Sequence, residues 1–290
     1  MSSLRIFRTF AAVASEGSFA AAAARVALTQ AAVGQQMRAL EADLRRPLFT
    51  RQGKSVVLND AGRELVPQVR RLLALYDQMR SPAAGTQEIA GTVHFGAVVS
   101  AVRPLIQATL SVKARHPALD LHVAAAKSLD LIAQVQAGEL DAAIAVREAG
   151  AGRDLAWTPL YGEPMVLLAP RKLDDASPRQ LLERHPFIRF DRTQHTGRLV
   201  ERTLKQLRAR PQEFLELNAI ESMVELVRAG LAVTIVPLLR GTRWAQDAKL
   251  RVVELPRAEE RQMALVQRRD AAQGAVVAAV VREFQAKLPA

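Results

Sequence analysis

The sequence predicts an α/β protein in which a small helical module with a hairpin and a long helix precede a larger α/β region. Two observations predict this order. Helical patterns crowd residues 1–80, and beyond residue 90 short apolar runs alternate with helical patterns, as they do in a doubly wound sheet. The chain has 290 residues, 49% of them hydrophobic and 24% charged. It is therefore globular and long enough for two or three domains.

The lack of cysteine and of recognisable targeting signals indicates the compartment in which the protein is expected. The chain contains no cysteine, which excludes disulfides and thiolate chemistry and suits a reducing compartment. The alanine-rich run at residues 19–24 is short and ends at Arg25. We therefore expect neither an export signal nor a membrane span, and we expect a cytoplasmic protein.

Positive charge is concentrated near the N-terminus. Residues 1–80 hold 12 Lys and Arg against 6 Asp and Glu, whereas the remaining residues hold 28 against 23. A surface of this kind suits a phosphate backbone. An arginine-rich surface that merely aids solubility is the alternative, and charge alone leaves both open.

Three short helices are predicted first. Apolar residues recur at three- and four-residue steps over residues 4–14. Gly17 suits a helix end and Ser18 an N-cap for a helix over 19–26. Thr29 is placed to cap the next helix, after a turn of about three residues. Short helices on such tight connections form a compact bundle.

A small hairpin, or wing, follows the third helix. The β-prone runs at residues 48–49 and 56–58 flank the polar turn "TRQGKS". Its tip carries Arg51, Gln52 and Lys54, so it presents positive charge.

A long helix is predicted from Asn59, a plausible N-cap, to about Arg80. Pro67 should bend this helix or weaken its first turns. Five apolar residues form a coiled-coil seam, and they are Leu65, Val69, Leu72, Tyr76 and Met79. Such a seam favours dimerisation with a second chain, and packing back onto its own bundle is the alternative.

The α/β region begins after a linker, "SPAAGT" at residues 81–86. Strands are predicted at 92–98, 119–126, 141–146, 164–169, 187–190, 214–218, 231–236, 251–255 and 263–269. Helices are predicted from about 99 to 115, from Ser128 to about 138, and near 196–209, 220–229 and 275–288. This many strands in about 200 residues fits two small lobes better than one large sheet.

Catalytic signatures are missing from the sequence. It has no glycine-rich phosphate cradle and no Gly-x-Ser-x-Gly elbow, and its five histidines lack metal-ligand spacing. No pair of acidic residues stands out as acid–base machinery. We therefore expect no enzyme, no metal and no cofactor.

The third helix has two different faces. Its apolar stripe consists of Val33, Met37, Leu40 and Leu44. Its opposite stripe is nearly neutral and consists of Gln30, Ala31, Gly34, Gln35 and Arg38. Glutamine suits an adenine edge, arginine a guanine edge, and an alanine methyl a thymine methyl. Packing of this face on another subunit is the alternative, but Arg51 and Lys54 would flank the helix and reach phosphates, which favours DNA.

Residues 4–65, which contain this helix and the wing, resemble the winged helix-turn-helix of LysR-type transcriptional regulators. The matching motifs are Gly17-Ser18-Phe19, Ala22-Ala23, Thr29-Gln30, Leu40-Glu41, Leu48-Phe49-Thr50-Arg51 and Asn59-Asp60-Ala61-Gly62. Relatives commonly carry proline at Ala31, serine at Gly34 and a basic residue at Gln35. The resemblance therefore implies a helix that enters the major groove but makes one phosphate or guanine contact fewer than its relatives.

The resemblance also implies a domain layout. A DNA-binding domain would occupy residues 1–58, a dimerisation helix 59–81 and a hinge linker 82–90. Residues 91–290 would form a two-lobed effector domain similar to periplasmic binding proteins. Its first lobe would use about 91–161 and 266–290, and its second about 162–265.

A small molecule would then bind between the lobes, where strand ends and helix N-termini offer N–H groups. By position, the predicted effector-binding residues are Val99, Ser100, Ser128, Arg147, His195, Thr196, Glu221 and Ser222. Each has a plain alternative as a cap, a loop charge or a surface turn residue. Together, Ser100, Ser128 and Arg147 favour a small organic anion.

The predicted function is therefore a regulator that binds double-stranded DNA through residues 18, 29–31, 34, 35, 38, 51 and 54. It would respond to a small-molecule effector as a homodimer or homotetramer. A small-molecule binding protein of similar form, or an enzyme on that scaffold, is the alternative. The first 80 residues and the missing catalytic residues argue against these two.

Overall fold

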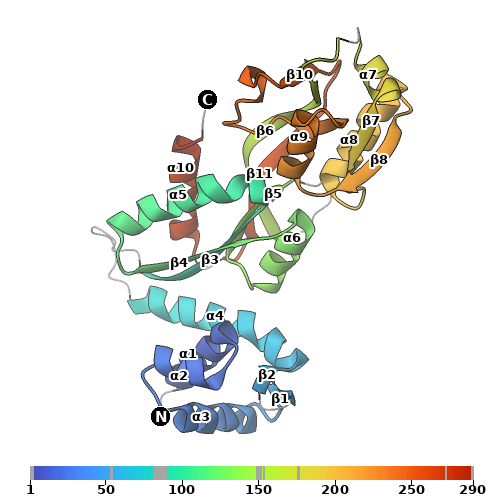
Figure 1. Cartoon of the computed structure of the whole chain (residues 1–290). Coiled ribbons are helices and arrows are strands. Elements are labelled where there is room, and N and C mark those ends of the chain that lie inside the picture. Colours follow the sequence, from blue (N-terminus) through green and yellow to red (C-terminus); the bar gives the residue numbers. More distant parts are fainter. Residues whose placement is uncertain are drawn as a thin grey trace.

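The computed structural model describes residues 3–52, 55–80, 90–147, 152, 154–174, 177–271 and 273–288. A small N-terminal module, drawn in blue, lies at one end of the molecule, and a helix drawn in cyan separates it from the α/β region (Figure 1). Among the described residues, no helix is both long and apolar enough to span a bilayer.

The module contains α1 (Ser3–Glu16), α2 (Phe19–Arg25) and α3 (Gln30–Asp43), as the periodicity predicted. Two side-chain caps fix the helix starts: Ser18 accepts a hydrogen bond from the N–H of Ala21, and Thr29 from the N–H of Ala32. The predicted apolar stripe of α3 packs inward, with Val33, Met37 and Leu40 buried together with Phe10 of α1.

The hairpin of β1 (Phe49–Gln52) and β2 (Ser55–Leu58) is held by a contact that the sequence did not reveal. One carboxylate oxygen of Glu41 accepts hydrogen bonds from the backbone N–H groups of Leu48 and Phe49, at 2.8 and 3.2 Å. Gly62 lies so close to this turn that a Cβ there would approach the Leu48 carbonyl oxygen more closely than van der Waals contact allows. The hairpin is therefore fixed to α3 at one side and to the next helix at the other.

That next helix, α4, runs from Asp60 to Arg80, and Asn59 accepts a hydrogen bond from the N–H of Gly62 at 2.8 Å. The predicted seam divides between two environments. Leu65 and Val69 are buried in the module's own core, whereas Leu72 is 43% exposed and Leu75 beside it is 48% exposed. The alternative of packing onto its own bundle therefore holds for Leu65 and Val69, whereas Leu72, together with the neighbouring Leu75, presents apolar surface to solvent.

The α/β region is built on one hydrogen-bonded path of strands. In the described residues their order is β4-β3-β5-β11-β6-β9-β7-β8, and β10 pairs with β6. The bounds are β3 Gly91–Ala97, β4 Leu119–Ala125, β5 Ala142–Val146, β6 Leu155–Pro170, β7 Pro186–Phe190, β8 Gln212–Leu217, β9 Val233–Pro237, β10 Leu250–Glu254 and β11 Glu260–Arg268. The pairs β3–β4, β3–β5, β7–β8 and β7–β9 are parallel, and the pairs that involve β6 or β11 are antiparallel.

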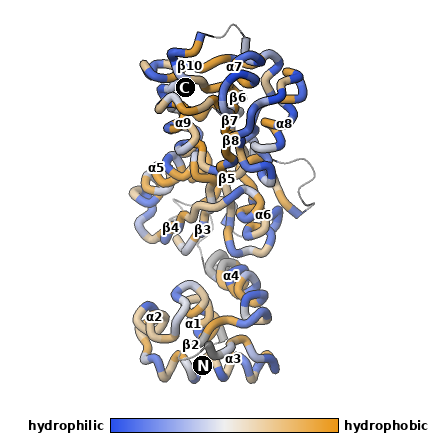
Figure 2. The backbone as a smooth tube through the Cα atoms, turned by 45° about the vertical axis from the view of Figure 1, so that its right-hand side comes forward, coloured by the Kyte–Doolittle hydropathy of each residue, from blue (hydrophilic) through white to orange (hydrophobic). Residues whose placement is uncertain are grey.

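The strand β6 joins the two predicted lobes. Its residues up to Pro164 pair with β11, whereas its residues from Met165 onward pair with β9 and β10. The hydrophobic cores separate at the same place, with Tyr161 in the core of the first lobe and Met165 in that of the second. The first lobe packs α5 (Val99–Arg115) and α10 (Gly274–Ala286) in one core and α6 (Ser128–Ala137) in another. The second lobe packs α7 (Pro178–Arg184), α8 (His195–Leu207) and α9 (Ile220–Arg228), and a short 3-10 turn (Trp244–Gln246) precedes β10. Figure 2 shows the tube of the first lobe, with α5, α6, β3 and β4, next to that of the second, with α7, α8 and β10.

Two features of this region were not predicted. The helix α7 was missed, and β6 was predicted to begin at residue 164 although it begins at Leu155. Pro159, Gly162 and Pro164 interrupt the strand pattern, because these residues normally mark turns. In the structure β6 absorbs the irregularity itself, because Leu160 is skipped in the register between the pairs Tyr161–Met263 and Pro159–Ala264.

The N-terminal module and the first lobe touch through charged residues. An Arg70 guanidinium nitrogen donates to the backbone carbonyl oxygen of Glu139 at 2.6 Å, and burial lowers the pKa of Arg70. Arg71 pairs with Asp270 at 3.0 Å. The helix α4 is therefore a physical link between the module and the α/β region.

Candidate functional site: an exposed helix face and an interlobe cavity

The helix α3 lies on the outer side of the module, away from the α/β region (Figure 1). Four residues of its predicted reading face are exposed to solvent, namely Gln30, Ala31, Gln35 and Arg38. Gly34 is half-buried, and a Cβ at this position would lie 3.8 Å from the Phe19 ring. The fold therefore leaves a nearly neutral polar face of this helix open to a partner.

The other predicted DNA-binding residues have different surroundings. Ser18 and Thr29 both serve as N-caps, so their hydroxyl oxygens are engaged by the helix starts. The backbone of Arg51 pairs with Val56 in the hairpin, and Lys54 lies outside the described residues. A residue that the sequence did not single out, Gln36, is buried in α3, and its Oε1 has no hydrogen-bond partner in the described chain.

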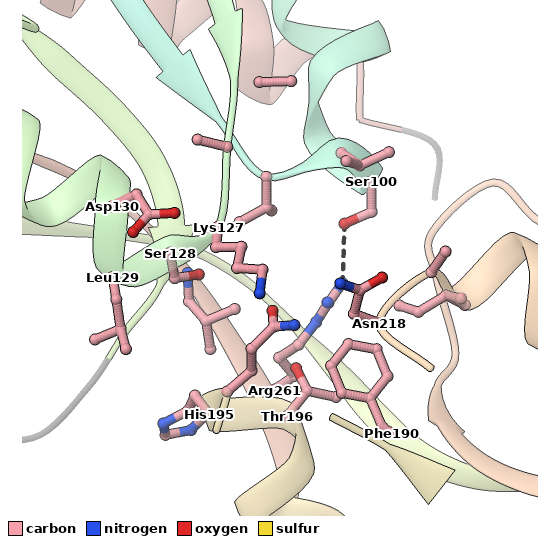
Figure 3. Close-up of a pocket in the computed structure, with 18 of the residues that line it drawn as sticks. Ser100, Lys127, Ser128, Leu129, Asp130, Phe190, His195, Thr196, Asn218 and Arg261 are labelled. Carbon is pink, nitrogen blue, oxygen red and sulfur yellow. Dashed lines mark hydrogen bonds between the residues drawn. The ribbon is translucent and has the colours of Figure 1, made fainter. Parts of the chain in front are cut away.

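A cavity of about 490 Å³ lies between the two lobes, where four helices begin (Figure 3). Six of the predicted effector-binding residues line it, and they are Val99, Ser100, Ser128, His195, Thr196 and Glu221. Arg147 and Ser222 do not line it and are exposed instead. Arg147 lies outside the cavity because its backbone N–H continues the β5–β11 ladder and donates to the Gln262 carbonyl oxygen at 2.8 Å.

The four helix starts at the cavity lack side-chain caps. The N-cap residues of α5, α6, α8 and α9 make no side-chain capping hydrogen bond, and they are Val98, Lys127, Gln194 and Ala219. By contrast, Ser or Thr side chains cap α2, α3 and α7. Uncapped N-termini carry partial positive charge and free donors. Their convergence from both lobes makes the cavity suited to an acceptor-rich or negatively charged ligand.

Two serine hydroxyls strengthen this donor character. The Ser100 oxygen accepts a hydrogen bond from Arg261 Nη2 at 3.0 Å (Figure 3). The Ser128 oxygen accepts one from the backbone N–H of Val146 at 3.1 Å. Among the described residues, no acceptor takes either hydroxyl hydrogen. Since a hydroxyl has one hydrogen to donate, both are free to donate to a molecule in the cavity.

Several cavity residues were missed by sequence reasoning, above all Lys127, Asn218 and Arg261. Lys127 could have been found, because it is the residue directly before the predicted helix start at Ser128. Arg261 could not, because it reaches the cavity from near the start of β11 and meets Ser100 across 161 residues of chain.

An ion pair links the two lobes beside the cavity. Lys127 Nζ lies 3.5 Å from Asp191 Oδ2. Hydrogen bonds from the Thr193 hydroxyl, Gln194 and the Thr193 N–H, together with this lysine, lower the pKa of Asp191 to about 2. Asp191 is therefore ionised at neutral pH and holds the turn before α8 in place.

Comparison with known families identifies both parts of the chain. A family described as "LysR substrate binding domain" matches residues 86–289, and a family described as "Bacterial regulatory helix-turn-helix protein, lysR family" matches residues 4–63. The chain belongs to the LysR family of transcriptional regulators. As in other LysR-type regulators, a helix-turn-helix domain precedes an α/β effector-binding domain.

Individual relatives agree with this assignment. The HTH-type transcriptional activator IlvY of Salmonella typhimurium is 26% identical over 265 residues, which cover 89% of this chain and 90% of IlvY. The regulator YnfL of Escherichia coli is 30% identical over 263 residues, covering 85% of this chain and 88% of YnfL. A solved structure of a full-length OxyR variant from Pseudomonas aeruginosa has a TM-score of 0.76 at 21% identity, covering 98% of this chain and 95% of OxyR. It shares the fold of the whole LysR-type chain.

Proposed function

We propose that this LysR-type regulator binds a small organic anion between the lobes of its effector domain and changes its contact with DNA in response. The observation that carries the ligand class is the convergence of four uncapped helix N-termini on one cavity. The free hydrogens of Ser100 and Ser128 add donors to the same space. The cavity thus offers donors from both lobes, which an anion with several oxygens satisfies.

On the DNA side, we propose that α3 enters the major groove. Gln30, Gln35 and Arg38 would contact base edges, and Ala31 and Gly34 would allow close approach. The flanking phosphates would be contacted by Ser18, Thr29, Arg51 and Lys54, which would also hold the helix in position. We assign residues 1–58 to the DNA-binding domain, 59–81 to the dimerisation helix, 82–90 to the hinge linker and 91–290 to the effector domain.

Response to the ligand would follow from the arrangement of the lobes. A ligand that contacts both lobes binds the closed arrangement more tightly than the open one, and so shifts the population toward closure. Because α4 touches the first lobe through Arg70 and Arg71, a change in lobe arrangement can reach the DNA-binding modules of a dimer or tetramer.

The experiment is a selection of genomic fragments by the purified full chain, followed by sequencing. We expect a small set of enriched fragments with two related half-sites spaced by about one helical turn of DNA, or a multiple of it. Genes beside the enriched fragments would indicate the metabolite class. Equal recovery of genomic and shuffled fragments would contradict the proposal.

A further inference from the structure

Arg261 has an unusual position for a charged residue. It is the second residue of β11, is only 4% exposed, and faces Glu163 directly across the β6–β11 ladder. Glu163 is itself 2% exposed. Arg261 Nε donates to Glu163 Oε2 at 2.8 Å, and Nη2 donates to the same oxygen and to Ser100 Oγ. Arg261 also lines the interlobe cavity (Figure 3).

The donors of this guanidinium are only partly used. A guanidinium has five N–H donors, and Nε and Nη2 of Arg261 are engaged as described. Within the described part of the chain, Nη1 has no hydrogen-bond partner. Nη1 is not one of the fully enclosed atoms that lack a partner, so it keeps access to solvent, and in the described part of the chain Arg261 lines the cavity between the lobes. A molecule in that cavity is the natural acceptor for Nη1.

We propose that Arg261 is the residue that selects a carboxylate in this cavity. Nη1 of Arg261 and the hydroxyl hydrogen of Ser100 donate to one carboxylate group, held at the N-terminus of α5. This inference rests on the proposed function and narrows its ligand from an organic anion to a small carboxylate. Arginine suits this task because its guanidinium stays charged, so that Nη1 can make a charge-assisted hydrogen bond to one carboxylate oxygen while the Ser100 hydroxyl donates to the group as well.

The remaining lining describes the rest of the ligand. Across the cavity, the Thr196 hydroxyl and the starts of α8 and α9 offer further donors. Between these polar ends, Val99, Phe190 and Ile220 provide apolar contact. The ligand class is therefore a short carboxylate with at least one more oxygen acceptor and a small apolar substituent.

Glu163 sets how strongly Arg261 attracts the ligand. Its carboxylate holds the guanidinium in place and keeps a buried cation tolerable, but it also neutralises the positive charge. Removal of the Arg261 charge should therefore weaken carboxylate binding, whereas removal of the Glu163 charge should strengthen it. A purely structural pair would respond in the same direction to both changes, because either change would loosen the same contact.

The test uses the full chain and isothermal titration with acetate, 2-oxobutanoate and 3-hydroxybutanoate, each compared with its neutral primary amide. We expect the wild-type chain to prefer an acid over its amide. Arg261→Gln should weaken binding of the acid by about 10- to 100-fold, the size of a missing charge-assisted hydrogen bond, and should abolish the preference for acid over amide. Glu163→Gln should bind the acid more tightly than the wild type.

The double variant Arg261→Gln with Glu163→Gln is the matched control, because it leaves no unpaired buried charge. The unfolding temperature of the double variant should lie closer to that of the wild type than the unfolding temperature of Arg261→Gln does. Its affinity for the acid should remain as low as that of Arg261→Gln. The inference is overturned if no acid binds to the wild type, if Arg261→Gln retains the acid preference, or if Glu163→Gln weakens binding as much as Arg261→Gln.

Failure of this inference and failure of the proposed function give different results. If the wild type enriches genomic fragments while no carboxylate depends on Arg261, the regulator stands and the inference falls. If Arg261→Gln loses carboxylate binding while the wild type enriches no fragment, the inference stands and the proposed function falls.

Discussion

Serine residues that look alike in the sequence have different roles in the structure. Ser18 and Ser177 accept hydrogen bonds from the N–H groups of their own helices and are ordinary N-caps. Ser128 also begins a helix, but its oxygen accepts from the N–H of Val146 at the end of β5. The difference between a cap and a ligand donor therefore depends on what lies beside the helix end rather than on the residue type.

Asp191 provides a prediction about pH. Its pKa is lowered to about 2 in the folded protein, so it stabilises the fold above its unfolded pKa and loses this effect as pH falls toward 2. Asp191→Asn should reduce the free energy of unfolding by about 1–3 kcal/mol at pH 7, since several hydrogen bonds to a charged group are weakened. Urea unfolding at pH 7, 5 and 3 should show the gap between wild type and variant constant down to pH 5 and smaller at pH 3. A gap that widens at pH 3 would contradict this assignment.

Gln35 and Lys54 provide a prediction about DNA recognition. Gln35 is exposed on α3 and should contact a base, whereas Lys54 of the hairpin should contact a phosphate. Gln35→Ala should change which fragments are preferred, with a cost of about 1–3 kcal/mol at one base position. Lys54→Ala should weaken all fragments alike and lower the salt dependence of binding by about one ion. Binding curves on selected and random DNA at several salt concentrations separate the two, and equal weakening on both DNAs for both variants would defeat this division.

At the scale of elements, the helical glycines Gly62 of α4 and Gly34 of α3 differ in what they permit. Gly62 allows the start of α4 to approach the Leu48 carbonyl, where a Cβ has no room. Gly34 meets only the Phe19 ring at ordinary contact distance. The first glycine is therefore required by the fold, and the second is not.

Replacing each glycine by alanine tests this difference. Gly34→Ala should raise the free energy of unfolding by about 0.5–1 kcal/mol, because alanine is the better helix former and the site has room. Gly62→Ala should lower it by about 1–3 kcal/mol through overpacking. Chemical denaturation of both variants measures the two effects, and a drop in stability for Gly34→Ala would show that its neighbours cannot accommodate a methyl group. If Gly34 serves close approach to DNA, Gly34→Ala should bind DNA more weakly despite its greater stability.

At the scale of the whole molecule, α4 has two roles along its length. Its first half completes the core of the DNA-binding module through Leu65 and Val69, and Arg70 contacts the first lobe. Beyond this point Leu72 and Leu75 remain exposed one turn apart. Exposed leucines at helical spacing on a long helix are typical of an interface between chains.

A pair of substitutions tests this interface. Leu72→Asp and Leu75→Asp together should lower the molar mass of the protein in solution, because a dimer seam would then bury two charges. Light scattering behind size-exclusion chromatography measures the mass over a range of protein concentrations. Circular dichroism checks that the chain is still folded, since neither leucine belongs to a buried core. An unchanged mass with an intact fold would show that this half of α4 is not the interface.

The local architecture of this protein follows from the sequence alone. The two faces of α3, the helix starts at Ser18 and Thr29 and the alternation of strands and helices all arise from short-range periodicity and capping, which the tertiary structure leaves intact. The sequence also placed Ser100, Ser128, His195 and Thr196 at helix starts, because parallel strand–helix units bring their ends to one edge of a sheet.

The surroundings of the ligand depend instead on how the lobes pack. Packing keeps Arg147 out of the cavity lining, because its backbone continues the β5–β11 ladder. It places Arg261, from a strand far along the chain, in that lining. It also buried Leu65 and Val69 of the α4 seam while leaving Leu72 exposed, and it extended β6 through residues that are typical of a turn. The physical reason is common to all four. Contacts between strands and helices that are distant in sequence leave no local periodicity, so their outcome is fixed only when the lobes pack.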